Sequence, residues 1–192
     1  YLILRDIFPE WALDLGLIRK GVTYVFFKLI ANFQYSMADT IGVQTKSNLT
    51  YLTDWANRPH RNLQVLQNWQ TPRKNIGSSI NVTNTSLAGR KIFAYIGNMG
   101  IAQGMDIFIN LAKKLNNNKN LGFLFVGRGS EVPRLKACIK ELSLSNILFF
   151  DEIDPQEIPG LLEQCHIGLL ALDPRHTTHN IPGKFLTYIL AS

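Results

Sequence analysis

The stretch FAYIGNMGIAQGMDIFINLAKKL, residues 93–115, decides the fold of this chain. It starts within a short apolar run, Ile92 to Ile96, whose β-branched and aromatic residues predict a buried strand. A turn rich in glycine follows. After the turn, apolar side chains recur at helical spacing on one face: Ile107, Phe108, Leu111, Ala112 and Leu115. A strand, a glycine turn and a helix in this order predict the first unit of a parallel α/β sheet.

The glycine turn is a candidate phosphate site. Gly97, Gly100 and Gly104 would let backbone N–H groups approach an anion, and the following helix adds partial positive charge at its N-terminus. The spacing is close to the dinucleotide-binding fingerprint without matching it, and no acidic residue about 20 positions later completes that fingerprint. From this turn alone, a phosphate site and a tight turn without a ligand are equally good interpretations.

The rest of the chain alternates predicted strands and helices. Strands are expected at residues 1–4, 38–44, 63–66, 121–126, 147–150 and 167–172. Helices are expected at residues 10–17, 19–37, 47–55, 131–142, 155–164 and 182–190. This rhythm is typical of βαβ units, so we predict an α/β fold built on parallel strands.

A polar segment divides the chain. Residues 71–89 contain Pro72, Gly77 and a run of Ser, Asn and Thr, a composition typical of an interdomain linker. We predict a first domain at residues 1–75, a linker at 76–88 and a second domain at 89–192. Because the chain begins in a predicted strand and stops in a predicted helix, we expect a fragment of a longer protein with both domains incomplete.

Composition narrows the classes of partner. The chain is 46% hydrophobic and 18% charged, which is typical of a folded globular protein. A net charge of +6 favours anionic partners, although a mildly basic surface without a specific role is the alternative. The two cysteines lack metal-ligand spacing, and His176 and His179 lie in a loop without a zinc pattern, so we predict no metal. No apolar run is long enough to span a bilayer.

Polar groups collect in the loops that follow the predicted strands, where a parallel sheet binds its ligands. The loop DPRHTTHNIPGK, residues 173–184, is the richest of these. Pro182 suits the first helical turn, Gly183 allows close backbone approach, and Lys184 supplies a charge that can bind phosphate. We favour an anion site here over a capped helix with a solvated lysine. Polar side chains also follow the other predicted strands of this domain: Asn98, Gln103, Arg128, Asp151 and Glu152.

Residues 19–37 combine basic residues with a dense apolar and aromatic set. One interpretation is a helix packed on a sheet, and the other is an amphipathic helix lying on an anionic membrane. Only Arg19, Lys20 and Lys28 supply charge, and apolar residues occupy most of the helix circumference. We therefore predict that the helix is part of the core and keep a membrane surface as the alternative partner.

In their order along the chain, these motifs resemble the family 4 glycosyltransferases, of the two-domain GT-B architecture. The resemblance is carried by RDIFPEWALDLGL, ADTIGVQT, LQNW at residues 66–69, YIGNMGIAQGMD, FVGRGSE and IPGKFLTYILAS. The nearest subgroup is the bacterial O-antigen and surface-polysaccharide enzymes that add aminosugars to lipid-linked acceptors. The resemblance implies two Rossmann-like halves, both incomplete here, with the acceptor-side domain first and the nucleotide-sugar-binding domain second.

The resemblance also implies a set of site residues. Family members retain the anomeric configuration and use a nucleotide-diphosphate sugar, here expected to be a UDP-sugar, with neither metal nor cofactor. The predicted catalytic residues are Asp6, His179 and Lys184. Asp6 is chosen for its place after the strand at residues 1–4 and not from the resemblance, and a local ion pair or a cap of the next turn is an equally good interpretation of it. The predicted donor-binding residues are Gly97, Asn98, Gly100, Gln103, Gly104, Gly127, Arg128, Pro182, Gly183 and Thr187.

Four of these positions depart from the family pattern. Asn98 and Gln103 stand where many members have an arginine and a lysine, and His179 and Thr187 stand where many have glutamates. Losing two cations weakens a diphosphate site unless Lys184 and helix-end N–H groups compensate. We interpret the changes as divergence within the subgroup.

The sequence thus predicts sugar transfer from a nucleotide donor to a lipid-linked glycan in the cytoplasm, with peripheral attachment to the inner face of the plasma membrane and no nucleic-acid partner. Two alternatives stay open. A nucleotide-sugar epimerase would interconvert the free donor without an acceptor, and a non-catalytic subunit would bind the donor through a decayed site. The fragment alone is expected to be inactive.

Overall fold

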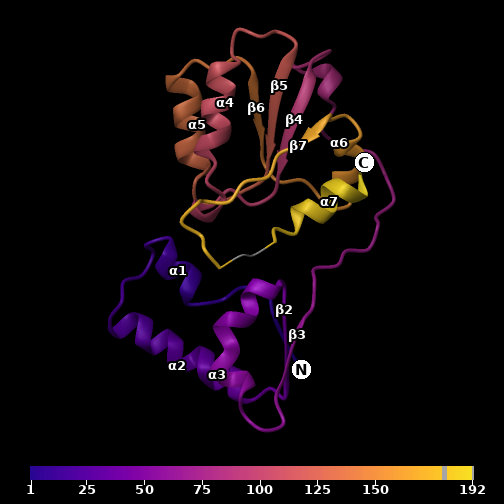
Figure 1. Cartoon of the computed structure of the whole chain (residues 1–192). Helices are drawn as coiled ribbons and strands as arrows, with labels where there is room; N and C mark the ends of the chain where they lie inside the picture. Colours follow the sequence, from indigo (N-terminus) through magenta and orange to yellow (C-terminus); the bar gives the residue numbers. More distant parts are fainter. Residues whose placement is uncertain (179–180, 192) are drawn as a thin grey trace. The chain divides into compact units, whose positions relative to one another are not determined.

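The computed structural model describes residues 1–178 and 181–191 (Figure 1). The chain forms two compact units. The first comprises Tyr1–Trp69 and Pro174–Gly183, and the second comprises Gln70–Asp173 and Lys184–Ser192. Each unit contains its own parallel sheet flanked by helices, so the predicted α/β class is confirmed.

The first unit has a three-stranded parallel sheet in the order β1-β2-β3. Its strands are β1 (Leu2–Leu4), β2 (Thr40–Val43) and β3 (Asn62–Val65), all at predicted positions. Its helices are α1 (Glu10–Asp14), α2 (Val22–Ser36), the 3₁₀ helix η1 (Lys46–Leu52) and α3 (Thr53–Ala56). Thr45 caps η1 through a capping box with Asn48, because each side chain accepts a hydrogen bond from the backbone N–H of the other residue.

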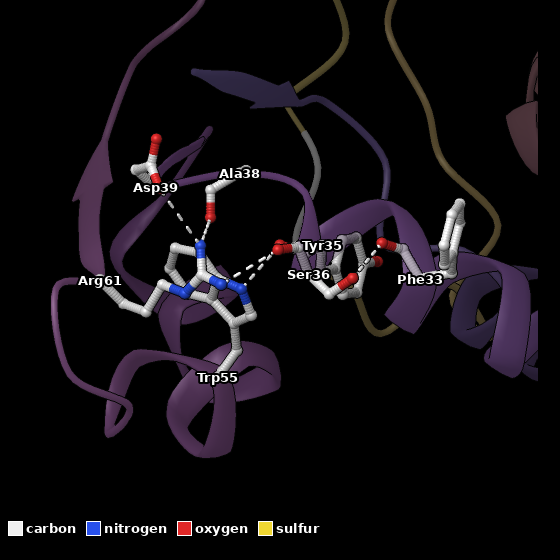
Figure 2. A network of polar contacts seen from close by, with 7 residues as sticks. All are labelled: Phe33, Tyr35, Ser36, Ala38, Asp39, Trp55 and Arg61. Atoms are coloured by element: carbon white, nitrogen blue, oxygen red, sulfur yellow. Dashed lines mark hydrogen bonds and ion pairs between the residues drawn. The ribbon is translucent and has the colours of Figure 1, made fainter.

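The C-terminus of α2 is fixed to the unit by two side chains (Figure 2). The Arg61 guanidinium donates hydrogen bonds to the carbonyl of Ser36, at 3.0 Å, and to that of Ala38. It also lies 5.5 Å from the centroid of a Trp55 ring, while the indole N–H of Trp55 donates to the Tyr35 carbonyl at 2.8 Å. These donors satisfy carbonyls that a helix end leaves open and place a cation at its negative pole.

Most of the apolar surface of α2 is exposed, contrary to the predicted core position. The buried residues of the helix are Ala31 and Tyr35, which are four positions apart and face the sheet. The exposed apolar residues in and directly after the helix are Val22, Val25, Phe26, Leu29, Ile30, Phe33 and Met37. The prediction was wrong because one narrow stripe suffices for packing on a three-stranded sheet.

The second unit has a four-stranded parallel sheet in the order β6-β5-β4-β7. Its strands are β4 (Lys91–Ile96), β5 (Leu121–Val126), β6 (Ile147–Phe150) and β7 (Ile167–Gly168). Its helices are η2 (Val82–Asn84), η3 (Ile101–Gln103), α4 (Asp106–Lys114), α5 (Val132–Glu141), α6 (Ile158–Leu162) and α7 (Lys184–Leu190). The last strand is shorter than the predicted 167–172, because the chain turns to pair the Asp173 N–H with the Ala102 carbonyl at 2.9 Å.

Helices cover both faces of this sheet, α4 and α5 on one side and α6 and α7 on the other (Figure 1). Tyr95 and Phe125 pack with Phe108 of α4 and Leu135 of α5. The opposite face is formed by the alternate residues of the same strands and by α6: Ile92, Ala94, Ile96, Leu124, Val126 and Leu161. Burial on both faces explains why these strands are continuous apolar runs in the sequence.

The division into units differs from the predicted domain boundaries in two places. Within the predicted linker, Ile80, Val82 and Leu87 are buried against the sheet of the second unit. The segment Pro174–Gly183, predicted as part of the second domain, packs with the first unit. No helix among the described residues has both the length and the hydrophobicity needed to cross a bilayer.

Candidate functional site

The candidate site lies where β4 ends, and it is made of the Gly97 turn and the first residue of α7. The Lys184 ammonium lies 3.8 Å from the centroid of the Tyr95 ring and donates a hydrogen bond to the Tyr95 hydroxyl. A Cβ built on Gly97 would lie 3.6 Å from Cε of Lys184 and 3.9 Å from its Nζ. The structure therefore brings together the glycine turn and the lysine that the sequence analysis singled out separately.

Among the residues that the structure describes, no carboxylate neutralises the charge of Lys184. None of the ion pairs formed by residues 1–178 and 181–191 includes it. Burial lowers the pKa of Lys184 to about 8, because the ammonium has lost part of its hydration. A half-buried cation without a counter-charge is a site at which an anionic ligand would be stabilised.

The turn after β4 is closed by its own side chains. The Gln103 side-chain oxygen accepts hydrogen bonds from the Gly100 N–H at 2.8 Å and from the Asn98 amide at 3.1 Å. This arises because Gly100 is the N-cap residue of η3, and the helix brings Gln103 back over the turn, as in a capping box. The prediction assigned the Asn98 and Gln103 amides to a diphosphate, whereas in this structure the Asn98 amide and the Gly100 N–H are used within the turn.

The loop after β5 packs directly on this turn, backbone against backbone. The Gly97 N–H donates to the Val126 carbonyl at 2.8 Å, and the Met99 N–H donates to the Arg128 carbonyl at 2.7 Å. Gly127 has a φ of +145°, and a Cβ placed on it would lie 2.1 Å from the Gly97 carbonyl oxygen. Close approach of two loops therefore explains why position 127 is glycine.

Three further predicted residues of the second unit have partners of their own. The Arg128 guanidinium forms an exposed ion pair with Glu152 at 3.2 Å. The Thr187 hydroxyl donates to the Gln70 side-chain oxygen at 3.0 Å. Gly104, with a φ of +56°, ends η3 and lies against the backbone of Asp173. None of these contacts tests the predicted roles in donor binding, which stay predictions.

The remaining predicted residues do not belong to the second unit. Asp6 is exposed directly after β1, and Pro182 and Gly183 end the segment that packs with the first unit. His179 lies outside the described residues. α7 begins at Lys184 and is only seven residues long, so its helix dipole would contribute little to the predicted anion site at its N-terminus.

Comparison with known proteins points to a family of enzymes. Residues 81–173, just under half of the chain, match the family model described as glycosyl transferases group 1. The predicted resemblance to glycosyltransferases is confirmed over these residues, and the match supports the predicted enzyme class. The turn and the β5 loop both lie within the matched residues.

The proteins to which this chain is similar are longer. "Probable glycosyltransferase WbjE" of Pseudomonas aeruginosa is 26% identical over 191 residues, which cover 95% of the chain and 46% of that protein. The structure of Anabaena HepE in complex with UDP and glucose has a TM-score of 0.68 at 16% identity, over 98% of this chain and 50% of that one. That of WaaG, described as a glycosyltransferase involved in lipopolysaccharide biosynthesis, has a TM-score of 0.59 at 16% identity, over 98% and 53%. At these identities, the two structures show a shared fold, and the chain spans about half of each relative's length.

Sequence reasoning missed how the segment before Lys184 is held. Both backbone groups of Ile181 are hydrogen-bonded: its N–H donates to the Gln44 side-chain oxygen at 2.9 Å, and its carbonyl accepts from the Asn68 amide at 2.8 Å. The buried Asn48 donates to the Thr178 carbonyl in the same segment. Gln44 and Asn68 lie in the quoted motifs ADTIGVQT and LQNW, so the sequence marked them without revealing their partner.

Sequence reasoning also missed Tyr95, which appeared only as one apolar member of a strand. Its hydroxyl is the hydrogen-bond partner of Lys184, and burial raises its pKa. Within residues 1–178 and 181–191, no three His, Cys, Asp or Glu side chains are grouped so that they could hold a metal ion. The expected independence from a metal and from a cofactor stays a prediction.

Proposed function

We propose that this protein is a glycosyltransferase that moves a sugar, with retention of configuration, from a uridine diphosphate donor to a lipid-linked glycan during synthesis of a bacterial surface polysaccharide. The observation that supports it best is the Lys184 ammonium beside the Gly97 turn at the end of β4, which forms no ion pair within residues 1–178 and 181–191. The fold shared with HepE, whose structure contains UDP and glucose, supports the class of donor. The lipopolysaccharide role printed for WaaG supports the class of product.

The chemistry requires a cation at this position. When the bond between the sugar and the diphosphate of the donor breaks, negative charge develops on the departing diphosphate. Positive groups already placed beside it stabilise that charge in the transition state and so lower the activation barrier of transfer. With asparagine and glutamine at the two positions where many family members carry cations, Lys184 is the basic side chain that the described structure places beside the turn. We therefore assign diphosphate stabilisation to Lys184.

Two experiments on the full-length protein test this function: calorimetric titration with uridine diphosphate, and a transfer assay with a nucleotide sugar and a polyprenyl-diphosphate-linked glycan. We expect uridine diphosphate to bind at least ten times more tightly than uridine, because its phosphates carry the negative charge that would pair with the Lys184 ammonium. We also expect a glycosylated lipid product. Interconversion of the free donor without an acceptor would favour the epimerase, and binding without either reaction would favour the non-catalytic subunit. Absence of binding would contradict the proposal.

We further propose that α2 attaches the protein to the anionic inner face of the plasma membrane, where a lipid-linked acceptor would lie. Several of its exposed apolar residues recur three or four positions apart along one side of the helix: Val22, Val25, Phe26, Leu29 and Phe33. Arg19 and Lys20 are exposed immediately before the helix. An apolar face next to basic residues is the pattern of a helix that lies in the interface of an anionic membrane.

Replacing Phe26 and Phe33 together by glutamine is expected to weaken binding to phosphatidylglycerol vesicles at least tenfold. The two rings are 57% and 68% exposed, and burying even part of each contributes about 1 kcal/mol or more to membrane affinity. Vesicle co-sedimentation measures the change. Ile107→Gln is the matched control, because Ile107 is 60% exposed on α4 of the other unit and should not affect binding. Equal binding of the double variant and the wild type would contradict the assignment.

A further inference from the structure

We propose that Tyr95 is a positioning residue of the donor site, whose buried hydroxyl holds the Lys184 ammonium and the backbone of the Gly97 turn together. The inference rests on the proposed function and deepens it, because it explains how the Lys184 ammonium is held in a position to bind a diphosphate. Tyr95 would not touch the donor, and it would act through Lys184, which does.

The ring of Tyr95 has little freedom to move. It lies one residue before the end of β4, and the residue is 0% exposed. Its ring centroid is 5.8 Å from that of Phe108 and 6.4 Å from that of Phe125, in tilted and edge-on contacts. Because the core fixes the ring, it also fixes the position of the hydroxyl at the end of the strand.

The hydroxyl of Tyr95 both donates and accepts a hydrogen bond. It donates its single hydrogen to the Asn98 carbonyl at 2.8 Å, and its oxygen accepts a hydrogen bond from the Lys184 ammonium. The ammonium also lies 3.8 Å from the centroid of the ring face, so the same side chain supplies a cation–π contact. One bond to Tyr95 leaves the ammonium two further donors with which to hold an anion.

The connection continues into the turn. The Asn98 amide donates to Gln103, whose side-chain oxygen also accepts from the Gly100 N–H. The hydroxyl of Tyr95 therefore joins the lysine to the network that closes the turn. The titratable side chains that act on it are Lys184, through the hydrogen bond, and Tyr188 of α7, whose charge adds to the larger effect of burial in raising the pKa of Tyr95. Within the described chain, no carboxylate forms an ion pair with Lys184.

Tyr95→Phe tests the inference, since it removes the hydroxyl and keeps the ring in the core. Tyr188→Phe is the matched control: its hydroxyl also bonds the backbone of β4, accepting from the Ile96 N–H at 3.2 Å, but does not reach the turn. Affinity for uridine diphosphate is measured by calorimetry between about pH 6.5 and 9.5, a range around the lowered lysine pKa. Thermal unfolding confirms that both variants fold.

We expect Tyr95→Phe to weaken uridine diphosphate binding about fivefold to tenfold at pH 7, whereas Tyr188→Phe stays within about twofold. We also expect the pH at which affinity declines to fall by about half a unit. The hydroxyl oxygen stabilises the charged lysine, so its loss lowers the lysine pKa. A role confined to core packing would leave this midpoint unchanged.

A double-mutant cycle with Lys184→Met separates the lysine contact from general damage. In the Lys184→Met background, the effect of Tyr95→Phe should shrink to about twofold. An equal effect in both backgrounds, or unchanged affinity and pH midpoint in the single variant, overturns the inference while leaving the proposed function intact. If the wild type binds no uridine diphosphate, the proposed function is wrong and this inference falls with it.

Discussion

Gly127→Ala is expected to lower the free energy of unfolding of the second unit by roughly 4 kcal/mol or more. The φ of +145° at this position is strained for any residue with a Cβ, and the new Cβ would lie 2.1 Å from the Gly97 carbonyl oxygen. The backbone cannot easily yield, because the Gly97 N–H is bonded to the Val126 carbonyl and the Met99 N–H to the Arg128 carbonyl. A loss of this size is a large part of the total stability of an ordinary domain.

Chemical denaturation of the wild type and the variant measures this loss. Gly183→Ala is the control, because a Cβ there meets no atom within 4 Å and its φ needs no glycine. We expect that control to stay within about 0.5 kcal/mol of the wild type. Gly129→Ala should behave like Gly127→Ala, since its Cβ would lie 2.2 Å from the Met99 carbonyl oxygen at a φ of +150°. A cost below about 1 kcal/mol for Gly127→Ala would show that the two loops are not packed as described.

Lys184→Met is expected to weaken uridine diphosphate binding about 30-fold to 100-fold and to reduce sugar transfer at least as much. Methionine keeps the length of the side chain and its contact with the Tyr95 ring, so the change removes mainly the charge. A charge-assisted hydrogen bond to a phosphate in a half-buried site contributes about 2–3 kcal/mol, which gives this range. The transition state carries more charge on the diphosphate than the ground state, so transfer should suffer most.

The pH dependence gives a second measurement. Wild-type affinity should decline as the pH rises through about 8, where free Lys184 loses its proton, while the variant should show no such decline. Burial lowers this pKa from 10.5 to about 8, so the unfolded chain binds the proton more tightly than the native one. Folding of the wild type is therefore penalised below pH 8, the penalty fades as the pH rises towards 10.5, and Lys184→Met removes it.

Lys136→Met is the matched control for these measurements. Lys136 also lies over an aromatic ring, 4.7 Å from the centroid of Phe149, but it forms an ion pair with Asp151 at 3.3 Å. Its charge is already compensated, so donor binding should change by less than about twofold. Undiminished binding and transfer by Lys184→Met would refute the assignment of diphosphate stabilisation to Lys184.

The sequence determined the elements of this protein whose pattern is local. Strands β4, β5 and β6 were predictable because a strand buried on both faces must be a continuous apolar run. The glycines of the turn and Lys184 were predictable as candidates because the loops after parallel strands are where such a sheet binds ligands. The resemblance to glycosyltransferases followed from the order of short motifs along the whole chain.

Only the tertiary structure decided which groups meet. Nothing within residues 19–37 indicates how much of α2 the sheet covers, so its apolar face was placed in the core although most of it is exposed. The sequence around Tyr95 does not indicate that its hydroxyl forms a hydrogen bond with Lys184 of α7. Likewise, the sequence around Ile181 does not indicate that its backbone is hydrogen-bonded to Gln44 and Asn68. Periodicity and capping act over a few residues, whereas these contacts join positions far apart in the chain, and their partners are chosen by packing.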